Sequence, residues 1–133
     1  MLLHRYLDIS AELEAGKTLV VFGPRRVGKT TLLDGFVANT KARIAFYRGD
    51  EISTQHSFEI ADSALLKPRI GSASILAIDE AQAIPNIGQS LKIINDTMPD
   101  LSVVVTGSSS FELAGQIGEP LTGRKTTRYL YPL

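Results

Sequence analysis

The chain has 133 residues, of which 14 are basic, 14 are acidic and none is cysteine. This length suits one domain, and the lack of cysteine excludes a disulfide framework, a thiolate metal site and a cysteine nucleophile. The zero net charge gives no support for binding bulk nucleic acid or an acidic membrane surface, and no apolar run approaches the roughly 20 residues that span a bilayer; we expect a cytoplasmic protein that does not contact a membrane.

Helical and strand-like segments alternate along the chain. Residues 2–15 have helical periodicity, and Gly16 is a plausible stop. Short apolar runs of strand length follow at residues 18–22, 74–78 and 102–105, and residues 43–48 and 128–133 are strand-like. The segments between them predict helices at residues 30–39, 57–67 and 87–96, and we expect Pro68 to end the second of these.

This alternation indicates the fold class. Strands that alternate with helices form a parallel sheet through right-handed crossovers. The apolar runs lack polar alternation, which is typical of strands that are covered on both faces. We therefore expect a three-layer α/β/α sandwich formed by one domain over residues 1–133.

The loop after the first strand carries the most specific motif. The segment GPRRVGKT matches G-x-x-x-x-G-K-[ST], which binds phosphate through backbone N–H groups and a helix N-terminus. Lys29 is expected to reach the β- and γ-phosphates, and the Thr30 hydroxyl to bind Mg²⁺. One of Arg25 and Arg26 could contact phosphate or a neighbouring subunit; the alternative is that both point into solvent. The predicted nucleotide-binding residues are Gly23, Pro24, Arg25, Arg26, Val27, Gly28, Lys29, Thr30 and Thr31.

Two adjacent acids follow the apolar run at residues 74–78. Asp79 and Glu80 stand where a Walker B strand of ATPases carries its acidic pair. Mg²⁺ prefers oxygen ligands and keeps several waters, so Asp79 is expected to hold the metal through its water shell. Glu80 is then placed to orient and deprotonate the attacking water. A solvated junction between strand and turn is the alternative.

The run at residues 102–105 ends in Thr106. If this strand lies between the first strand and the strand that ends in Asp79, Thr106 lies between the phosphate loop and the acidic pair. Its hydroxyl could then hydrogen-bond the attacking water or the γ-phosphate, as the sensor residue of AAA-type ATPases does. A turn and helix cap formed by Thr106 and the following serines is the alternative.

Together these segments resemble the AAA-type ATPases of prokaryotes. The similar segments are GPRRVGKTT, LAIDEAQAIPN, VVVTGSSSFEL and LTGRKTTRYLYPL, at residues 23–31, 76–86, 103–113 and 121–133. The resemblance implies the strand order 5-1-4-3-2 and ATP as the substrate. It also implies a lid, a winged-helix region and a further C-terminal domain beyond Leu133, which we expect to be absent from this chain.

Arg124 lies where the family pattern also has an arginine. The resemblance implies that it could contact a γ-phosphate in its own chain or in a neighbour, as an arginine finger does. The alternative is a solvated basic turn formed with Lys125 and Arg128.

The predicted function is therefore ATP binding and Mg²⁺-dependent hydrolysis, with ATP and ADP as ligands and a homo-oligomer as a possible assembly. A nucleotide-gated switch that hydrolyses slowly remains open. So does a DNA-acting ATPase whose DNA contact lies in the missing C-terminal region. Glu80 and the absence of a basic lid sequence argue against a small-molecule kinase. The sequence does not identify a protein or DNA client.

Overall fold

The computed structural model describes residues 8–23, 29–107, 117, 118 and 120–129, and of Lys29, Thr30 and Thr31 it describes the backbone alone. In chain order, the elements are α1 (Ile9–Glu12), β1 (Thr18–Phe22), α2 (Lys29–Asn39), β2 (Ile44–Arg48), α3 (Ile52–Phe58), α4 (Ser63–Ile70), β3 (Ile75–Asp79), the 3₁₀ turn η2 (Ala81–Ala83), α5 (Ile87–Thr97), β4 (Ser102–Gly107) and β5 (Lys125–Tyr129). None of the described helices is both long and apolar enough to span a bilayer.

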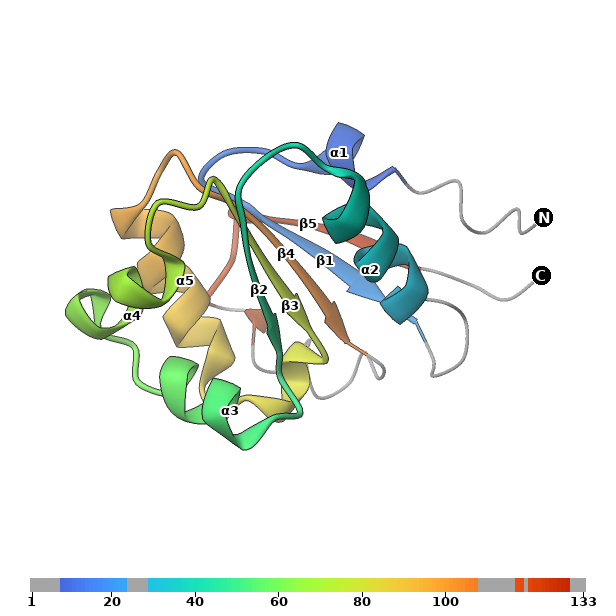
Figure 1. Ribbon diagram of the computed structural model, residues 1–133. Helices are drawn as coiled ribbons and strands as arrows, with labels where there is room; N and C mark the ends of the chain where they lie inside the picture. The colour runs from blue at the N-terminus through green and yellow to red at the C-terminus, as the bar shows by residue number, and fades with distance from the viewer. Residues whose placement is uncertain (1–7, 24–28, 108–116, 119, 130–133) are drawn as a thin grey trace.

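The sheet of the described residues has the strand order β2-β3-β4-β1-β5, and every neighbouring pair is parallel (Figure 1). This is the predicted order read from the other edge, so the expected topology is confirmed. β4, which comes late in the chain, is inserted between β1 and β3. Because the strands are parallel, the carboxyl ends of β1, β4, β3 and β2 lie side by side. We call this row of strand ends the carboxyl edge of the sheet, and the row of strand starts its amino edge.

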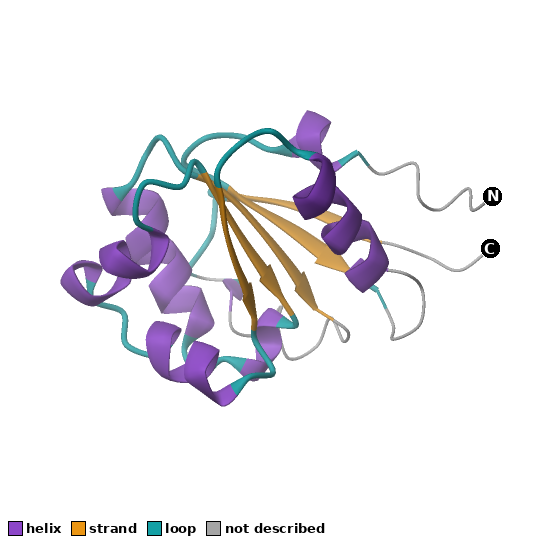
Figure 2. Cartoon of the chain, viewed as in Figure 1, coloured by secondary structure: helices purple, strands orange, loops and turns teal. Residues whose placement is uncertain are grey.

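Two helical layers cover the sheet (Figure 2). Successive strand side chains point to opposite faces, so Val20 and Phe22 belong to one core cluster and Leu19 and Val21 to the other. The first cluster packs against α3, α4 and α5, and the second against α1 and α2. The predicted three-layer sandwich is confirmed.

Helix α5 shows how the sequence specifies a layer. Its residues Ile87, Leu91 and Ile94 recur at helical spacing and are all buried against the sheet. The polar side chain of Asn95 is also buried, and it forms a hydrogen bond with Thr18 at the start of β1. That bond ties α5 to the amino end of β1, an interior strand of the sheet.

The helix predicted at residues 57–67 is wrong in its bounds. The chain forms two helices there, and the second begins where the Asp62 side chain accepts a hydrogen bond of 2.9 Å from the Ala64 N–H. Pro68 does not end α4, which continues to Ile70. Proline removes one backbone hydrogen bond, and the burial of Leu66 and Ile70 in the core outweighs that loss.

The helix predicted at residues 2–15 is also too long at its carboxyl end. Residues 1–7 lie outside the described residues, and α1 begins after Asp8, whose carboxylate accepts a bond from the Ser10 N–H. It ends at Glu12, because Leu13 already has extended backbone angles. Gly16, at φ +78°, then turns the chain into β1.

The last strand begins earlier than predicted. β5 runs over Lys125–Tyr129, so it includes Thr126 and Thr127, which pair with Leu19 and Val20 of β1. Residues 130–133, at the end of the predicted strand, lie outside the described residues. The two threonines are β-branched and suit a strand, although they interrupt the apolar pattern on which the prediction rested.

Candidate functional site

The phosphate-loop motif lies between β1 and α2, which is the strand–loop–helix context that the motif requires. Gly23 extends the pairing of β1, because its N–H donates to the Gly107 carbonyl at the end of β4 (3.2 Å). Pro24, Arg25, Arg26, Val27 and Gly28 lie outside the described residues, as do the side chains of Lys29, Thr30 and Thr31. Their roles as phosphate and metal contacts stay predictions.

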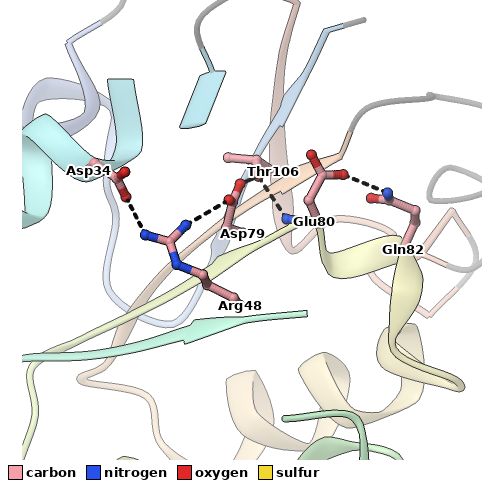
Figure 3. A network of polar contacts seen from close by, with 6 residues as sticks. All are labelled: Asp34, Arg48, Asp79, Glu80, Gln82 and Thr106. Atoms are coloured by element: carbon pink, nitrogen blue, oxygen red, sulfur yellow. Dashed lines mark hydrogen bonds and ion pairs between the residues drawn. The ribbon is translucent and has the colours of Figure 1, made fainter. Parts of the chain in front are cut away.

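Asp79 ends β3 at the same edge of the sheet, and the residue is 4% exposed. Its Oδ1 accepts a hydrogen bond of 2.6 Å from the Thr106 hydroxyl (Figure 3). Its Oδ2 lies 3.2 Å from Nη1 of Arg48. A buried carboxylate is costly unless it is hydrogen-bonded and paired, and Asp79 is both.

Thr106 joins the two acidic residues. Besides donating to Asp79, its Oγ1 accepts a hydrogen bond of 3.1 Å from the backbone N–H of Glu80. Thr106 belongs to β4, which lies between β1 and β3, so the predicted insertion of this strand is confirmed. The bonds it makes here fix Asp79 and Glu80, whereas its contact with water or phosphate stays a prediction.

Glu80 turns the chain sharply after β3. Its backbone is left-handed (φ 51°, ψ 51°), a conformation that costs a non-glycine residue roughly 1–2 kcal/mol. Its carboxylate accepts a hydrogen bond of 2.7 Å from Nε2 of Gln82, which lies in η2. The turn thus keeps the Glu80 carboxylate beside the strand tip while Asp79 stays buried (Figure 3).

Gly49 makes this turn possible. Its N–H donates to the Asp79 carbonyl at 2.6 Å, and a Cβ at this position would lie 2.3 Å from the Glu80 carbonyl oxygen. No side chain larger than hydrogen fits there without a backbone shift. The link between β2 and α3 is therefore pressed against the strand tip that carries the acidic pair.

Sequence reasoning did not include Arg48 in the site. The residue ends β2 and is paired in register with Asp79. Its Nη1 contacts Asp79, and its Nη2 lies 3.1 Å from Oδ1 of Asp34, in the helix that follows the phosphate loop. The signal was available, because the expected strand order makes these strands neighbours and each ends in a charged residue.

Arg124 lies at the amino ends of the strands, on the side of the sheet away from Asp79, Glu80 and Thr106. Its carbonyl accepts a hydrogen bond from the N–H of Thr18, the first residue of β1, and its guanidinium pairs with Asp96 near the end of α5. The structure therefore does not bring Arg124 together with Asp79, Glu80 and Thr106 within one chain. A contact between Arg124 and a neighbouring chain's nucleotide stays a prediction.

The carboxylate oxygens of Asp79, at the tip of β3, are of the kind that Mg²⁺ prefers. The described residues contain no group of three or more His, Cys, Asp or Glu side chains that could hold a metal ion. Mg²⁺ commonly binds through one or two carboxylates together with water and substrate phosphates, and the Asp79 carboxylate suits that mode. The site thus fits a metal that arrives with a nucleotide.

The parallel sheet, the motif between β1 and α2 and the acidic tip of β3 define the class of a P-loop nucleotide-binding core. A model of the AAA domain family matches residues 15–133, and the chain belongs to this family. No curated protein matches the sequence.

The fold is similar to that of a solved structure, the Walker-type ATPase PABY2304 of Pyrococcus abyssi. The two chains share 21% sequence identity with a TM-score of 0.55, over 87% of this chain and 49% of the other. The chain thus spans about half the length of that ATPase. At this identity the likeness shows the fold alone.

Proposed function

We propose that the chain binds ATP together with Mg²⁺ and hydrolyses the terminal phosphoanhydride. The observation that carries this proposal is the hydrogen-bonded group formed by Asp79, Thr106 and Glu80. It lies at the carboxyl ends of β3 and β4, next to the strand that leads into the phosphate loop. Ligands of open α/β sheets bind at this edge.

Each residue has a distinct role in the proposal. Backbone N–H groups over residues 23–31 bind the phosphates, and Lys29 counters their charge. Thr30 and Asp79 hold Mg²⁺, which neutralises charge on the phosphates when it is bound. Glu80 orients the attacking water and accepts its proton. Thr106 keeps Asp79 and Glu80 in their relative positions.

A switch that binds nucleotide and hydrolyses it slowly is the second candidate. The observation that favours it is the bond between Gln82 and the Glu80 carboxylate, which occupies the proposed base. Under this alternative, ADP forms slowly on the protein and is then retained. Single-turnover and steady-state rates separate the two candidates, because hydrolysis within one turnover is fast for an ATPase and slow for the switch.

The binding proposal is tested with two variants and a control. Lys29→Ala removes the ammonium group that counters phosphate charge, so calorimetry should show a loss of ATP affinity of at least about tenfold. Asp79→Asn keeps the shape and an acceptor for Thr106 but removes the charge. It should weaken Mg·ATP binding much more than binding of ATP in EDTA.

Lys41→Ala is the matched control, because Lys41 is exposed and precedes β2 at the amino edge of the sheet. This variant should bind ATP as the parent does. Unchanged ATP affinity in a folded Lys29→Ala protein would overturn the phosphate-loop assignment. Equal losses with and without Mg²⁺ in Asp79→Asn would remove Asp79 from the metal site.

A further inference from the structure

Arg48 connects the acidic tip of β3 to the helix that follows the phosphate loop. One guanidinium nitrogen lies 3.2 Å from Oδ2 of Asp79, and the other lies 3.1 Å from Oδ1 of Asp34 in α2 (Figure 3). The planar fork of arginine can contact two carboxylates at once, whereas a lysine ammonium is a single point charge. Arg48 therefore contacts two carboxylates at once: that of Asp79, which is expected to hold the metal, and that of Asp34 on α2.

The two carboxylates differ in their access to water. The Asp79 side chain is 6% exposed, whereas the Arg48 and Asp34 side chains are 39% and 45% exposed. A buried carboxylate needs a nearby cation more than an exposed one does. The guanidinium also lies over the ring of Phe46, on the same strand β2, 4.9 Å from its centroid.

The same carboxylate is where the proposed function places the metal. A guanidinium and a divalent cation repel each other at one carboxylate, so Arg48 competes with Mg²⁺ for Asp79. Arg48 can withdraw at small cost, because its side chain is partly exposed and its contact with Asp34 does not depend on Asp79.

We propose that Arg48 is a positioning residue that neutralises Asp79 in the metal-free protein and releases it when Mg²⁺ binds with the nucleotide. This inference rests on the proposed function. It assigns Arg48 no contact with the phosphates. As a consequence, the affinity for Mg·ATP is lower than it would be without Arg48, because binding must break the contact between Arg48 and Asp79.

The test compares the parent with Arg48→Gln, using the non-hydrolysable analogue AMP-PNP. For each protein, the measured quantity is the dissociation constant of AMP-PNP in EDTA divided by the dissociation constant of AMP-PNP in excess Mg²⁺. Arg48→Gln removes the competing cation, so this ratio should rise by about two- to fivefold, which is the range for ion pairs of this exposure. Without nucleotide and in EDTA, the variant's melting temperature should fall by about 3–6 °C, because Asp79 loses a compensating charge.

Two further variants isolate the cause. Arg43→Gln is the matched control, since Arg43 precedes the same strand at its other end and contacts Ser72. It should leave the ratio unchanged. Arg48→Lys keeps the charge and should keep the ratio near that of the parent. If Arg48→Gln does not fold, Arg48→Met, which also lacks the charge, provides the measurement, and its ratio should rise as well.

Asp34→Asn supplies a test of the shared contact. Without the Asp34 charge, Arg48 pairs with Asp79 alone and competes more strongly with Mg²⁺. The ratio should therefore fall below that of the parent. Removing a nearby negative charge would also lower the ratio without any help from Arg48. In the Arg48→Gln background the effect of Asp34→Asn should therefore largely disappear, and an undiminished effect would overturn the proposal.

The outcomes separate this inference from the proposed function. If the parent does not bind AMP-PNP, or gains no affinity from Mg²⁺, the proposed function fails. If the parent gains affinity from Mg²⁺ but Arg48→Gln leaves the ratio unchanged, only the role of Arg48 is wrong. Equal weakening in EDTA and in Mg²⁺ would identify Arg48 as a phosphate contact and would also overturn the proposal.

Discussion

The hydroxyl of Thr106 forms two bonds that a valine of the same shape cannot form. It donates to Asp79 and accepts from the Glu80 N–H, and the residue is 1% exposed. In Thr106→Val, the N–H of Glu80 and one oxygen of Asp79 each lose a hydrogen-bond partner inside the protein. We expect the free energy of unfolding, measured by urea denaturation, to fall by about 1–3 kcal/mol.

Thr106→Ser keeps the hydroxyl and is the control for this prediction. It removes one methyl group from a buried position, so it should lose only about 1 kcal/mol. If Thr106→Val were as stable as Thr106→Ser, the hydroxyl would not be what holds the two acids together.

Glu80 can be tested without disturbing its turn. Glu80→Gln keeps a side-chain oxygen that can accept from Gln82, so the strand tip should keep its shape. Binding of Mg·ATP should persist, whereas hydrolysis should slow by about 10²–10⁴, the usual cost of losing a general base. Phosphate release under saturating ATP measures the rate, and turnover within a few-fold of the parent would exclude Glu80 as the base.

At the level of elements, β1, β3 and β4 were predictable because their apolar runs are buried on both faces. Residues 18–22 form β1 within the predicted bounds, and the acidic tip of β3 follows its run as expected. Burial of consecutive side chains is a local property of the sequence, which is why these runs were recognisable.

The helices between β2 and β3 were harder to predict, because their bounds depend on contacts made far along the chain. The burial of Ile70 holds α4 together beyond Pro68, and this burial requires the sheet to be in place. The same reason explains why Arg48 was missed. Its partners Asp34 and Asp79 are 14 and 31 residues away, so their contacts follow from the order of the strands and not from any local pattern in the sequence.

The link from β2 to α3 offers a prediction at this scale. Gly49→Ala would place a Cβ 2.3 Å from the Glu80 carbonyl oxygen, so the backbone around the acidic pair must move. We expect a loss of about 1–3 kcal/mol in the free energy of unfolding, as for an overpacked site, together with slower hydrolysis.

A second glycine provides a control of opposite sign. Gly35 lies within α2, and a Cβ there would meet nothing within 4 Å. Gly35→Ala should therefore raise the free energy of unfolding by about 0.5–1 kcal/mol, because alanine favours the helix. A Gly49→Ala protein as stable as Gly35→Ala would show that the β2–α3 link does not press on the strand tip.

Across the whole molecule, the sheet separates two groups of predicted site residues. Asp79, Glu80 and Thr106 lie at its carboxyl edge, whereas Arg124 lies at its amino edge and is paired with Asp96. An arginine finger cannot cross the sheet within one chain. If Arg124 stabilises charge on a transferring phosphoryl group, it does so in the site of a neighbouring copy.

This arrangement predicts that hydrolysis depends on association between chains. An arginine supplied by a neighbour can be worth about 10³–10⁵ in rate, so the activity per chain should rise with protein concentration.

Mixing two inactive variants provides the sharper measurement. Lys29→Ala chains keep Arg124 but lack a working site, and Arg124→Ala chains keep the site but lack the finger. Each alone should be nearly inactive, whereas the mixture should recover part of the parent's turnover. Activity that is independent of concentration, together with a mixture no faster than its parts, would contradict a role for Arg124 between chains.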